Sequence, residues 1–339
     1  MRMRLFRIGP DDYVLGVVVH HVSADGFSVG PLTRDVVVAY AARAIGVAPQ
    51  WDPLPVQFAD YAVWKHSLLG EFDDPSSEAH RQMDYWARAL ADRPGFLDFP
   101  TDRPRPAVRP TAGAAIPVHL DAETHAALVS LARECGASLF MVLQAAFALC
   151  VSRFANEKDV TVATSIAGRG EPELDDLVGN FSDDVLMRVV VDEGESVADL
   201  VAAVRSAALA AYANPDVSNP RLERALGLDP NSPYNPLFQV TLILQRAADG
   251  LAAEFPGLSI EQHPVPTTVA KHEIEFSLND HYDSVGVPTG VTGGLLYQTA
   301  LFDESTAQSF VERFVSVLRT MAADASGADR DIRRCEECR

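Results

Sequence analysis

Two adjacent histidines, followed closely by an aspartate and a glycine, form the stretch of this sequence best suited to chemistry. His20, His21, Asp25 and Gly26 lie within seven residues and come directly after an apolar run. A histidine side chain has an unperturbed pKa of about 6.5, so a neutral imidazole can accept and return a proton near neutral pH. The sequence therefore predicts a general base at one of the two histidines.

The apolar run before the histidines predicts how they are held. Residues 13–19 have the β-branched composition that is typical of a strand buried on both faces, and we expect this strand to reach His21. Successive side chains on a strand point to opposite faces, so His20 and His21 cannot face the same way. One histidine can face a cleft while the other packs behind it. Gly26 lacks a β-carbon and leaves room for a ligand.

Asp25 admits two interpretations. It could be the N-cap of the helix that follows, or it could point inward as a buried carboxylate that needs a cationic partner. Arg169, which follows a predicted strand in the second part of the chain, is the candidate partner. Such a pair would join two lobes at the base of a cleft.

The remaining elements predict a layered α/β (α+β) architecture. We expect a hairpin of strands at residues 4–8 and 13–21, and a glycine-rich loop at residues 286–294. Helical spacing of apolar residues predicts helices at residues 29–43, 58–69, 80–90, 122–135, 138–154, 197–212 and 304–323. Further strands are expected at residues 160–165, 185–191, 237–244, 273–278 and 293–298. This mixture with few hairpins favours a sheet covered by helices.

A proline-rich segment divides the chain. Pro100, Pro104, Pro106 and Pro110 fit neither a helix interior nor a central strand, so residues 99–110 are expected to form a stiff crossing. We predict a first lobe at residues 1–98, a second lobe at residues 111–325, and a tail at residues 326–339.

Composition narrows the classes of function. The formal net charge of −19 argues against nucleic-acid binding, which requires a basic surface. The uncharged apolar stretch at residues 138–152 is too short to span a membrane. The N-terminal residues show no secretory signal pattern. We therefore expect a cytoplasmic protein with no nucleic-acid or membrane partner.

Other chemistry-bearing residues give weaker patterns. Cys150 lies in an apolar helix and is expected in the core, whereas Cys335 and Cys338 are expected in a solvated tail, because no second pair completes a zinc site. His263, His272 and His281 recur at a spacing that suits neither a helix face nor a compact metal site, so we predict no metal. The signatures of serine hydrolases, phosphate-binding loops and zinc proteases are absent from the sequence.

Several motifs together carry a family resemblance. His20-His21-x-x-x-Asp25-Gly26 resembles the active-site motif of condensation domains of nonribosomal peptide synthetases, which belong to the chloramphenicol acetyltransferase-like acyltransferases. Residues 54–64 resemble the family's "LPVQYADYAVW", residues 97–106 its "L-PTDRPRP", and residues 167–188 its "AGR…LVGFFVNTLVLR". Residues 235–240 are similar to "HPLFQV", and residues 301–303 to the final "LFD". The resemblance runs from about residue 5 to about residue 323.

The resemblance implies a fold and a reaction. The fold would be the two-lobed chloramphenicol acetyltransferase-like fold, with a truncated N-terminal lobe, because family members carry a substantial run before the histidine motif. The reaction would be amide bond formation, in which the amine of a carrier-bound aminoacyl group attacks the thioester of an upstream carrier-bound aminoacyl or peptidyl group. The domain itself would bind no cofactor, and the phosphopantetheine arms would belong to the carriers.

The resemblance also implies roles for single residues. His21 would position or deprotonate the attacking amine, and His20 would support the strand. Asp25 would be architectural and paired with Arg169, while Gly26 would keep a tunnel open. The implied partners are an upstream and a downstream peptidyl carrier protein and an adjacent adenylation domain.

Three alternatives stay open. The wording of the motifs favours the subtype that takes a D-configured donor. The chain could instead be a noncatalytic or inactive fragment or docking module of a synthetase. An epimerisation domain or a related acyltransferase with the same histidine motif is a further alternative, although the "EGHGRE" loop of epimerisation domains is absent at residues 168–173.

Two segments depart from the family pattern. Residues 180–184 put carboxylates where the family has "FFVNT", and residues 271–276 replace a "KFDL"-like strand with a more acidic one. Buried carboxylates would need partners, whereas exposed ones cost little. Both departures bear on substrate choice more than on fold.

Overall fold

The computed structural model of the chain describes residues 1–192, 194–247, 259–260, 265 and 268–323. These residues divide into two compact units. The first unit is built mainly from Met1–Ala79 and Ile166–Asp183, and the second contains His80–Ser165 and most of the described residues from Asp184 onward. The predicted tail at residues 326–339, with Cys335 and Cys338, lies outside the described residues, as does His263.

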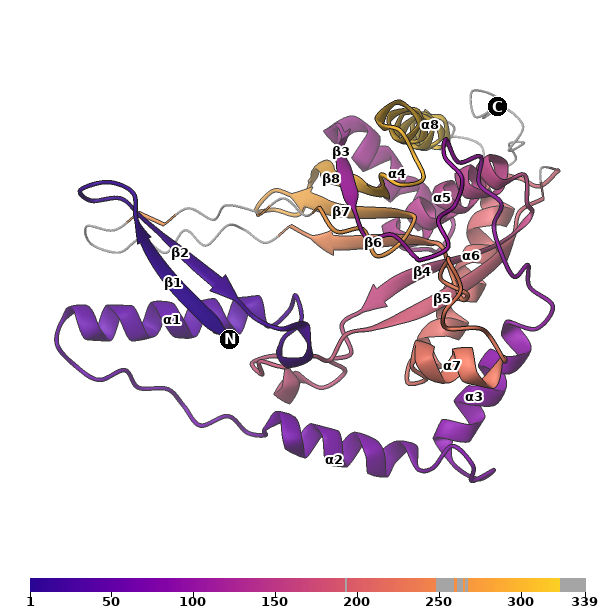
Figure 1. Cartoon of the computed structure of the whole chain (residues 1–339). Helices are drawn as coiled ribbons and strands as arrows, with labels where there is room; N and C mark the ends of the chain where they lie inside the picture. Colours follow the sequence, from indigo (N-terminus) through magenta and orange to yellow (C-terminus); the bar gives the residue numbers. More distant parts are fainter. Residues whose placement is uncertain (193, 248–258, 261–264, 266–267, 324–339) are drawn as a thin grey trace. The chain divides into compact units, whose positions relative to one another are not determined.

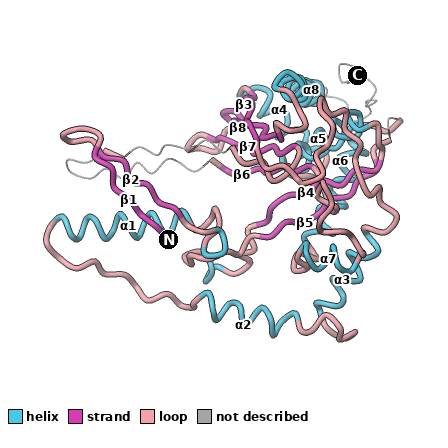
Figure 2. The backbone as a smooth tube through the Cα atoms, in the orientation of Figure 1, coloured by secondary structure: helices cyan, strands magenta, loops and turns pink. Residues whose placement is uncertain are grey.

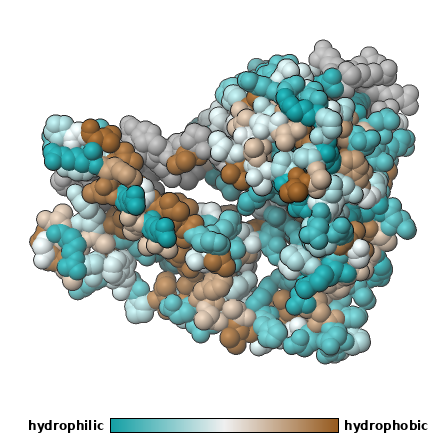
Figure 3. All heavy atoms as spheres, in the orientation of Figure 1, coloured by the Kyte–Doolittle hydropathy of each residue, from teal (hydrophilic) through white to brown (hydrophobic). Residues whose placement is uncertain are grey.

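A hairpin opens the first unit. Strand β1 (Arg2–Arg7) pairs antiparallel with β2 (Tyr13–Val18), and Leu5 lies opposite Leu15. Neither strand has a buried residue, so the prediction of a strand buried on both faces is wrong. The physical reason is that the sheet has only two strands in the described part of the chain, and its faces remain uncovered. Figure 3 shows hydrophobic side chains gathered over this hairpin.

Two helices and two short 3-10 turns complete the first unit. Helices α1 (Val29–Ala44) and α2 (Phe58–Leu69) contain no buried residue and are joined by the long loop visible in Figure 2. A reciprocal capping box between Gln57 and Asp60 begins α2. The 3-10 turns lie at His21–Ser23 and Pro172–Leu174. The apolar core of this unit is a small cluster of Leu174, Leu177 and Phe181, against which Val56 and Tyr61 pack.

A sheet of six strands forms the frame of the second unit. Its order is β3-β8-β7-β6-β4-β5. The strands are β3 (Gly113–Leu120), β4 (Asp159–Ile166), β5 (Asp183–Val190), β6 (Val240–Arg246), β7 (Ile274–Tyr282) and β8 (Pro288–Gln298). Strands β4, β6 and β7 run parallel, whereas β8 pairs antiparallel with both β7 and β3. The layered α/β prediction is confirmed.

Helices α5 and α8 pack against this sheet through aromatic side chains. The helices that follow α2 are α3 (Glu78–Ala89), α4 (Ala122–Glu134), α5 (Leu139–Ala155), α6 (Val197–Tyr212), α7 (Asn219–Ala225) and α8 (Glu304–Ala323). The ring of Phe276 on β7 lies 5.3 Å from that of Phe147 on α5 and 4.6 Å from that of Phe314 on α8. Cys150 is buried in α5, as expected of a small core residue. Figure 1 shows α4, α5 and α8 gathered beside the sheet.

The two compact units divide earlier in the chain than the predicted lobes. The proline-rich segment belongs to the second unit, where Arg105 forms an ion pair with Glu273 at 2.6 Å. Helix α3 packs there as well, because the indole of Trp86 donates a hydrogen bond of 2.7 Å to the carbonyl of Asn214. The division lies between Ala79 and His80, whereas the predicted crossing is at residues 99–110.

Among the described residues, no single helix is both long and apolar enough to cross a membrane. Helices α4 and α5 meet the length and composition criteria only when taken together, as a pair bent by 100°.

Candidate active site

The two histidines lie on an exposed turn rather than on a strand. Strand β2 ends at Val18, and His20 caps the 3-10 turn that begins at His21. Nδ1 of His20 accepts a hydrogen bond of 3.1 Å from the backbone N–H of Val22. Both histidines are exposed, so the expectation that one of them packs behind the other is wrong. The ring of His20 accepts a hydrogen bond from a backbone N–H two residues ahead, and this local bond competes with continued strand pairing.

Asp25 anchors the C-terminal end of this turn. It is 5% exposed, and its Oδ1 accepts a hydrogen bond of 2.8 Å from the backbone N–H of Ser28. Its Oδ2 accepts a hydrogen bond of 3.0 Å from the N–H of Phe181, and its own N–H donates to the carbonyl of Gly179 at 3.1 Å. The N-cap position of α1 is Ser28, so Asp25 is not the helix cap that was considered as an alternative.

Arg169 provides the cation for this carboxylate. Its Nη2 lies 3.1 Å from Oδ1 of Asp25, and both side chains are almost fully buried. Its Nη1 donates to the carbonyl of Leu177 at 2.9 Å, and the guanidinium lies 4.1 Å from the ring centroid of Phe181. Both members of the pair lie in the first unit, whereas Arg169 was expected in a second lobe.

Ser28 is the member of the site that sequence reasoning missed. Its side chain is fully buried, and Oγ lies within hydrogen-bond distance of Asp25, Arg169 and Gly179. The distances are 2.8 Å to Oδ1 of Asp25, 3.1 Å to Nη2 of Arg169 and 2.8 Å to the carbonyl of Gly179. The only indication of this role in the sequence is a small hydroxyl residue shortly after the Asp25-Gly26 pair. We call Asp25, Ser28, Arg169 and Gly179 the polar knot.

The polar knot determines the charge state of its carboxylate. Burial alone would raise the pKa of Asp25, but the hydrogen bonds from Phe181, Ser28 and Arg169 together lower it below its ordinary value. Asp25 is therefore ionised at neutral pH and is held by its partners. A carboxylate that accepts several hydrogen bonds serves as an anchor rather than as a proton donor.

Aromatic side chains pack beside the polar knot. The ring of Phe58 lies 5.0 Å from that of Phe181, and the ring of Tyr61 lies 4.8 Å from it. Gly179 must be a glycine here, because a Cβ at this position would lie 2.3 Å from the ring of Phe58. The packing of α2 thus fixes the loop segment that accepts the backbone N–H of Asp25.

Gly26 and the histidine rings remain open to solvent. Gly26 is exposed, and its carbonyl accepts a hydrogen bond of 3.3 Å from the N–H of Val29. Within the described residues, no side chain hydrogen bonds to the ring of His21. The exposed imidazole of His21 therefore lies on a short turn, and the buried ion pair of Asp25 and Arg169 fixes the C-terminal end of that turn.

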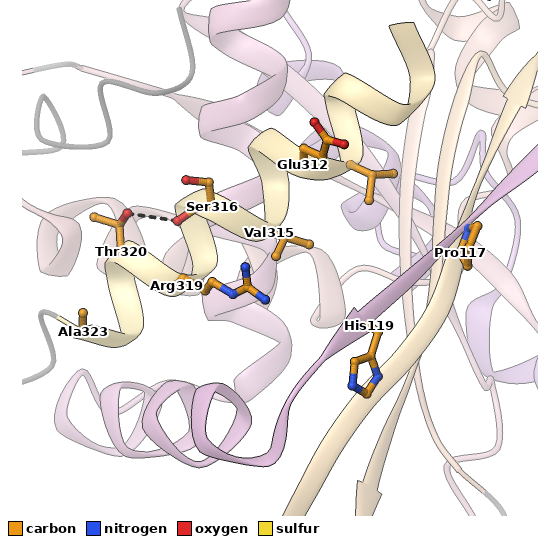
Figure 4. Close-up of a pocket in the computed structure, with 9 residues that line it drawn as sticks. Pro117, His119, Glu312, Val315, Ser316, Arg319, Thr320 and Ala323 are labelled. Atoms are coloured by element: carbon orange, nitrogen blue, oxygen red, sulfur yellow. Dashed lines mark hydrogen bonds between the residues drawn. The ribbon is translucent and has the colours of Figure 1, made fainter. Parts of the chain in front are cut away.

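No metal site accompanies these residues, since no group of three His, Cys, Asp or Glu side chains in the described ranges could hold an ion. A groove in the second unit lies elsewhere, between β3 and α8, and has a volume of about 690 Å³. Figure 4 shows Pro117, His119, Val315 and Arg319 along it. None of the predicted site residues lines this groove, so it is not part of the candidate site.

The sequence profile of the condensation-domain family matches residues 1–337. The chain belongs to the condensation-domain family. It is 41% identical over 326 residues to the nonribosomal peptide synthetase CymA of Salinispora arenicola, covering 96% of this chain and 4% of that protein. It is 38% identical over 323 residues to the isonitrile lipopeptide synthase of Mycobacterium tuberculosis, covering 95% of this chain and 13% of that protein.

Solved structures of condensation-domain relatives support the same assignment. The X-domain from teicoplanin biosynthesis superimposes with a TM-score of 0.88 at 30% identity, covering 98% of this chain and 73% of that one. This condensation domain therefore has the chloramphenicol acetyltransferase-like fold. The chain spans only a small part of the curated synthetases that it matches.

Proposed function

We propose that this condensation domain forms an amide bond between two carrier-bound substrates. An upstream peptidyl carrier protein would present an aminoacyl or peptidyl thioester on its phosphopantetheine arm. A downstream carrier would present an aminoacyl group with a free amine, loaded by an adjacent adenylation domain. The domain would contribute no cofactor of its own.

The proposed reaction needs little more than alignment and one proton acceptor. The amine nitrogen attacks the thioester carbonyl, a C–N bond forms, the C–S bond breaks, and the donor arm leaves as its thiol. The amine loses one proton, and the thiolate gains one. His21 could take this proton or hold the amine in line for attack. Tethered reactants supply much of the barrier reduction through proximity, and thioesters are already activated.

The observation that carries this proposal is the polar knot next to the histidine turn. Asp25 is buried, ionised and fixed by Arg169 and Ser28, so it positions the turn rather than reacting. His21 is exposed on that turn, where a substrate amine could reach its ring. The structure thereby supports separate roles for the two parts of the motif, with Asp25 as a positioning residue.

A peptide-forming assay with two loaded carriers tests the proposal. We expect His21→Ala to lower the rate of amide formation by about 10²–10⁴-fold, the range for loss of a positioned proton-transfer group. His20→Ala should have a smaller effect, because it removes one cap of the turn. His66→Ala, which changes an exposed histidine on α2, is the matched control. A His21→Ala variant with unchanged rate would exclude the assigned role.

A noncatalytic role is the second candidate, and one observation favours it. The chain superimposes well on the X-domain from teicoplanin biosynthesis, which has also been solved in a complex with OxyB. A docking module would bind its partner without turnover. Carrier binding without any product, in the assay above, would support this candidate over condensation.

The donor configuration is tested with the same assay. The sequence motifs favour a D-configured donor, so thioesters of D- and L-amino acids should differ in rate, with the D-form faster. An epimerisation domain would instead exchange the α-proton of a carrier-bound aminoacyl group. Deuterium incorporation at that carbon without amide formation would favour epimerisation.

A further inference from the structure

The groove between β3 and α8 runs along an unpaired edge of the sheet. In the described part of the chain, β3 is the outermost of the six strands and pairs with β8. A Cβ added at Gly290 would lie 2.9 Å from the carbonyl oxygen of Leu120, and one added at Gly294 would lie 3.3 Å from that of Ile116. The even-numbered residues of β3 thus direct their backbone groups toward β8, and the odd-numbered ones direct theirs outward.

Three residues of β3 present unused backbone groups at this edge. The N–H and C=O groups of Ala115 and His119 and the C=O group of Pro117 make no hydrogen bond to any described residue. Gly113 uses its own outward N–H in a hydrogen bond of 2.8 Å to the carbonyl of Thr268, which agrees with this direction. A row of unpaired donors and acceptors is a template for an added strand.

Pro117 limits what can add to this edge. Proline lacks an N–H, and within sheets it is found at edges, where it interrupts ladder pairing. A long strand, such as β3 of a second copy, would lose hydrogen bonds at this point. A short segment can still pair with Ala115 and His119 on either side of the proline.

The facing wall of the groove is a row of side chains on α8. Glu312, Val315 and Arg319 are three and four residues apart, so they follow one another on one face of the helix, as Figure 4 shows. At 1.5 Å per residue, Glu312 and Arg319 are about 10 Å apart along the helix axis. The wall therefore carries a negative charge, an apolar group and a positive charge in order.

Both charges of this wall are available to a ligand. Arg319 is exposed and makes no ion pair or hydrogen bond with the described residues. Asp121, on which Arg319 acts electrostatically, is occupied as the N-cap of α4, where it accepts a hydrogen bond of 2.7 Å from the N–H of Thr124. Glu312 accepts one hydrogen bond of 2.9 Å from Gln308, whereas an ionised carboxylate has about four acceptor sites.

The spacing of the wall matches an extended peptide. Alternate side chains of a strand point to one face, and three of them span about 13 Å. A basic, an apolar and an acidic side chain at alternate positions can therefore reach Glu312, Val315 and Arg319. The groove volume of about 690 Å³ lies in the range of ligand sites, roughly 300–1,000 Å³.

We propose that this groove docks a short extended segment of a partner protein, which adds as a strand to β3 and carries an acidic and a basic side chain flanking an apolar one. Main-chain hydrogen bonds to Ala115 and His119 supply affinity, and the charges on α8 supply selectivity. This docking surface goes beyond the proposed condensation activity, and it lies within the second unit alone.

Fluorescently labelled heptapeptides test the charge pattern by anisotropy titration of the full chain. The probes are Thr-Asp-Thr-Val-Thr-Lys-Thr and the reverse charge order Thr-Lys-Thr-Val-Thr-Asp-Thr, because the strand can add in either direction. The neutral control is Thr-Asn-Thr-Val-Thr-Gln-Thr. We expect one charged peptide to bind at least 10-fold more tightly than the neutral one. If neither does, the proposal is overturned.

N-methylation of the tighter peptide tests strand addition. Only alternate N–H groups of an added strand face β3. Methylation of one alternate set should weaken binding at least 10-fold, and methylation of the other set should leave it within about 2-fold. Equal effects of the two sets would contradict strand addition.

Two matched variants locate the binding site. Arg319→Gln should remove most of the advantage of the charged peptide over the neutral one, because the acidic side chain loses its partner. Arg224→Gln, which changes an exposed arginine on α7, should keep that advantage. A folded Arg319→Gln variant with the full advantage would exclude the groove.

Other occupants give different results. A dimer that forms with rising concentration and is disrupted by Arg319→Gln would assign the groove to a second copy and overturn the proposal. A variant ending at Ala323 that binds the peptide at least 10-fold more tightly would assign it to residues 324–339 instead. Amide formation is measured separately and should be unchanged in Arg319→Gln, so failure of docking and failure of condensation are distinguishable.

Discussion

At the scale of single residues, the ion pair of Asp25 and Arg169 has the largest consequences. Both side chains are buried and pair with each other, and the carboxylate accepts further hydrogen bonds from Ser28 and Phe181. Removal of one partner leaves an uncompensated buried charge, which costs more than the intact pair contributes. The pair therefore links the histidine turn to the stability of the first unit.

We expect Arg169→Ala to lower the free energy of unfolding of the first unit by about 3–5 kcal/mol. Arg34→Ala is the control, because Arg34 pairs with Asp176 on the surface and should cost about 0–1 kcal/mol. Urea unfolding followed by tryptophan fluorescence measures both. Equal losses in the free energy of unfolding would show that the buried pair contributes no more to stability than the surface pair.

A second prediction at this scale concerns pH. Burial lowers the pKa of His272 to about 4, with opposite contributions from Asp184 and from Lys271 and Arg109. The unfolded chain, with a histidine pKa of about 6.5, binds the proton first as the pH falls. Stability is therefore full above pH 6.5 and declines between pH 6.5 and 4, by about 3 kcal/mol in total.

His272→Phe should remove this part of the pH dependence without loss of folding. A phenylalanine fits because the His272 ring already packs against Phe238, with the centroids 5.0 Å apart. His119→Phe, an exposed histidine on β3, is the control and should leave the slope unchanged. Denaturant unfolding at pH 7 and pH 5 measures how the free energy of unfolding changes with pH. The prediction is contradicted if this change is the same in His272→Phe as in the unaltered chain.

At the scale of elements, helical periodicity was the most informative part of the sequence. The predicted helix at residues 58–69 coincides with α2, and the predicted helix at residues 304–323 coincides with α8. Strands were predicted less well than helices. Strand β3 was not predicted, and the expected glycine-rich loop at residues 286–294 is largely part of β8. Gly293 allows this close strand approach, since a Cβ there would lie 2.1 Å from the carbonyl oxygen of Ser277.

Close packing around Gly179 gives a prediction for the site elements. Gly179→Ala should displace Phe58 and loosen the polar knot, at a cost of about 1–3 kcal/mol from overpacking. Gly170→Ala in the same segment is the control, because no atom lies within 4 Å of the added Cβ. Thermal unfolding and near-ultraviolet circular dichroism report on both variants, and equal melting temperatures would refute the packing argument.

At the scale of the whole molecule, the two compact units differ in how well they bury their elements. Strands β1 and β2 and helices α1 and α2 have no buried residues, whereas β6 and β7 each contain three buried residues and α5 is largely buried. Local stability follows the number of buried apolar contacts. The first unit is therefore expected to open more readily than the second.

Hydrogen exchange measured by mass spectrometry tests this difference. We expect amides of β1 and β2 to exchange at least 100-fold faster than those of β6 and β7 at pH 7. Helix α5, whose residues are nearly all buried, provides the protected reference within the same sample. Similar protection of β1 and β7 would contradict the prediction.

The sequence by itself determined the family, the layered α/β fold and the identity of the histidine motif, because each of these depends on local composition and short motifs. Only the tertiary structure decided how the motif is held. Arg169, which the sequence offered only as a candidate partner, meets Asp25 and Ser28 across more than 140 residues of chain, and no local pattern encodes such a contact.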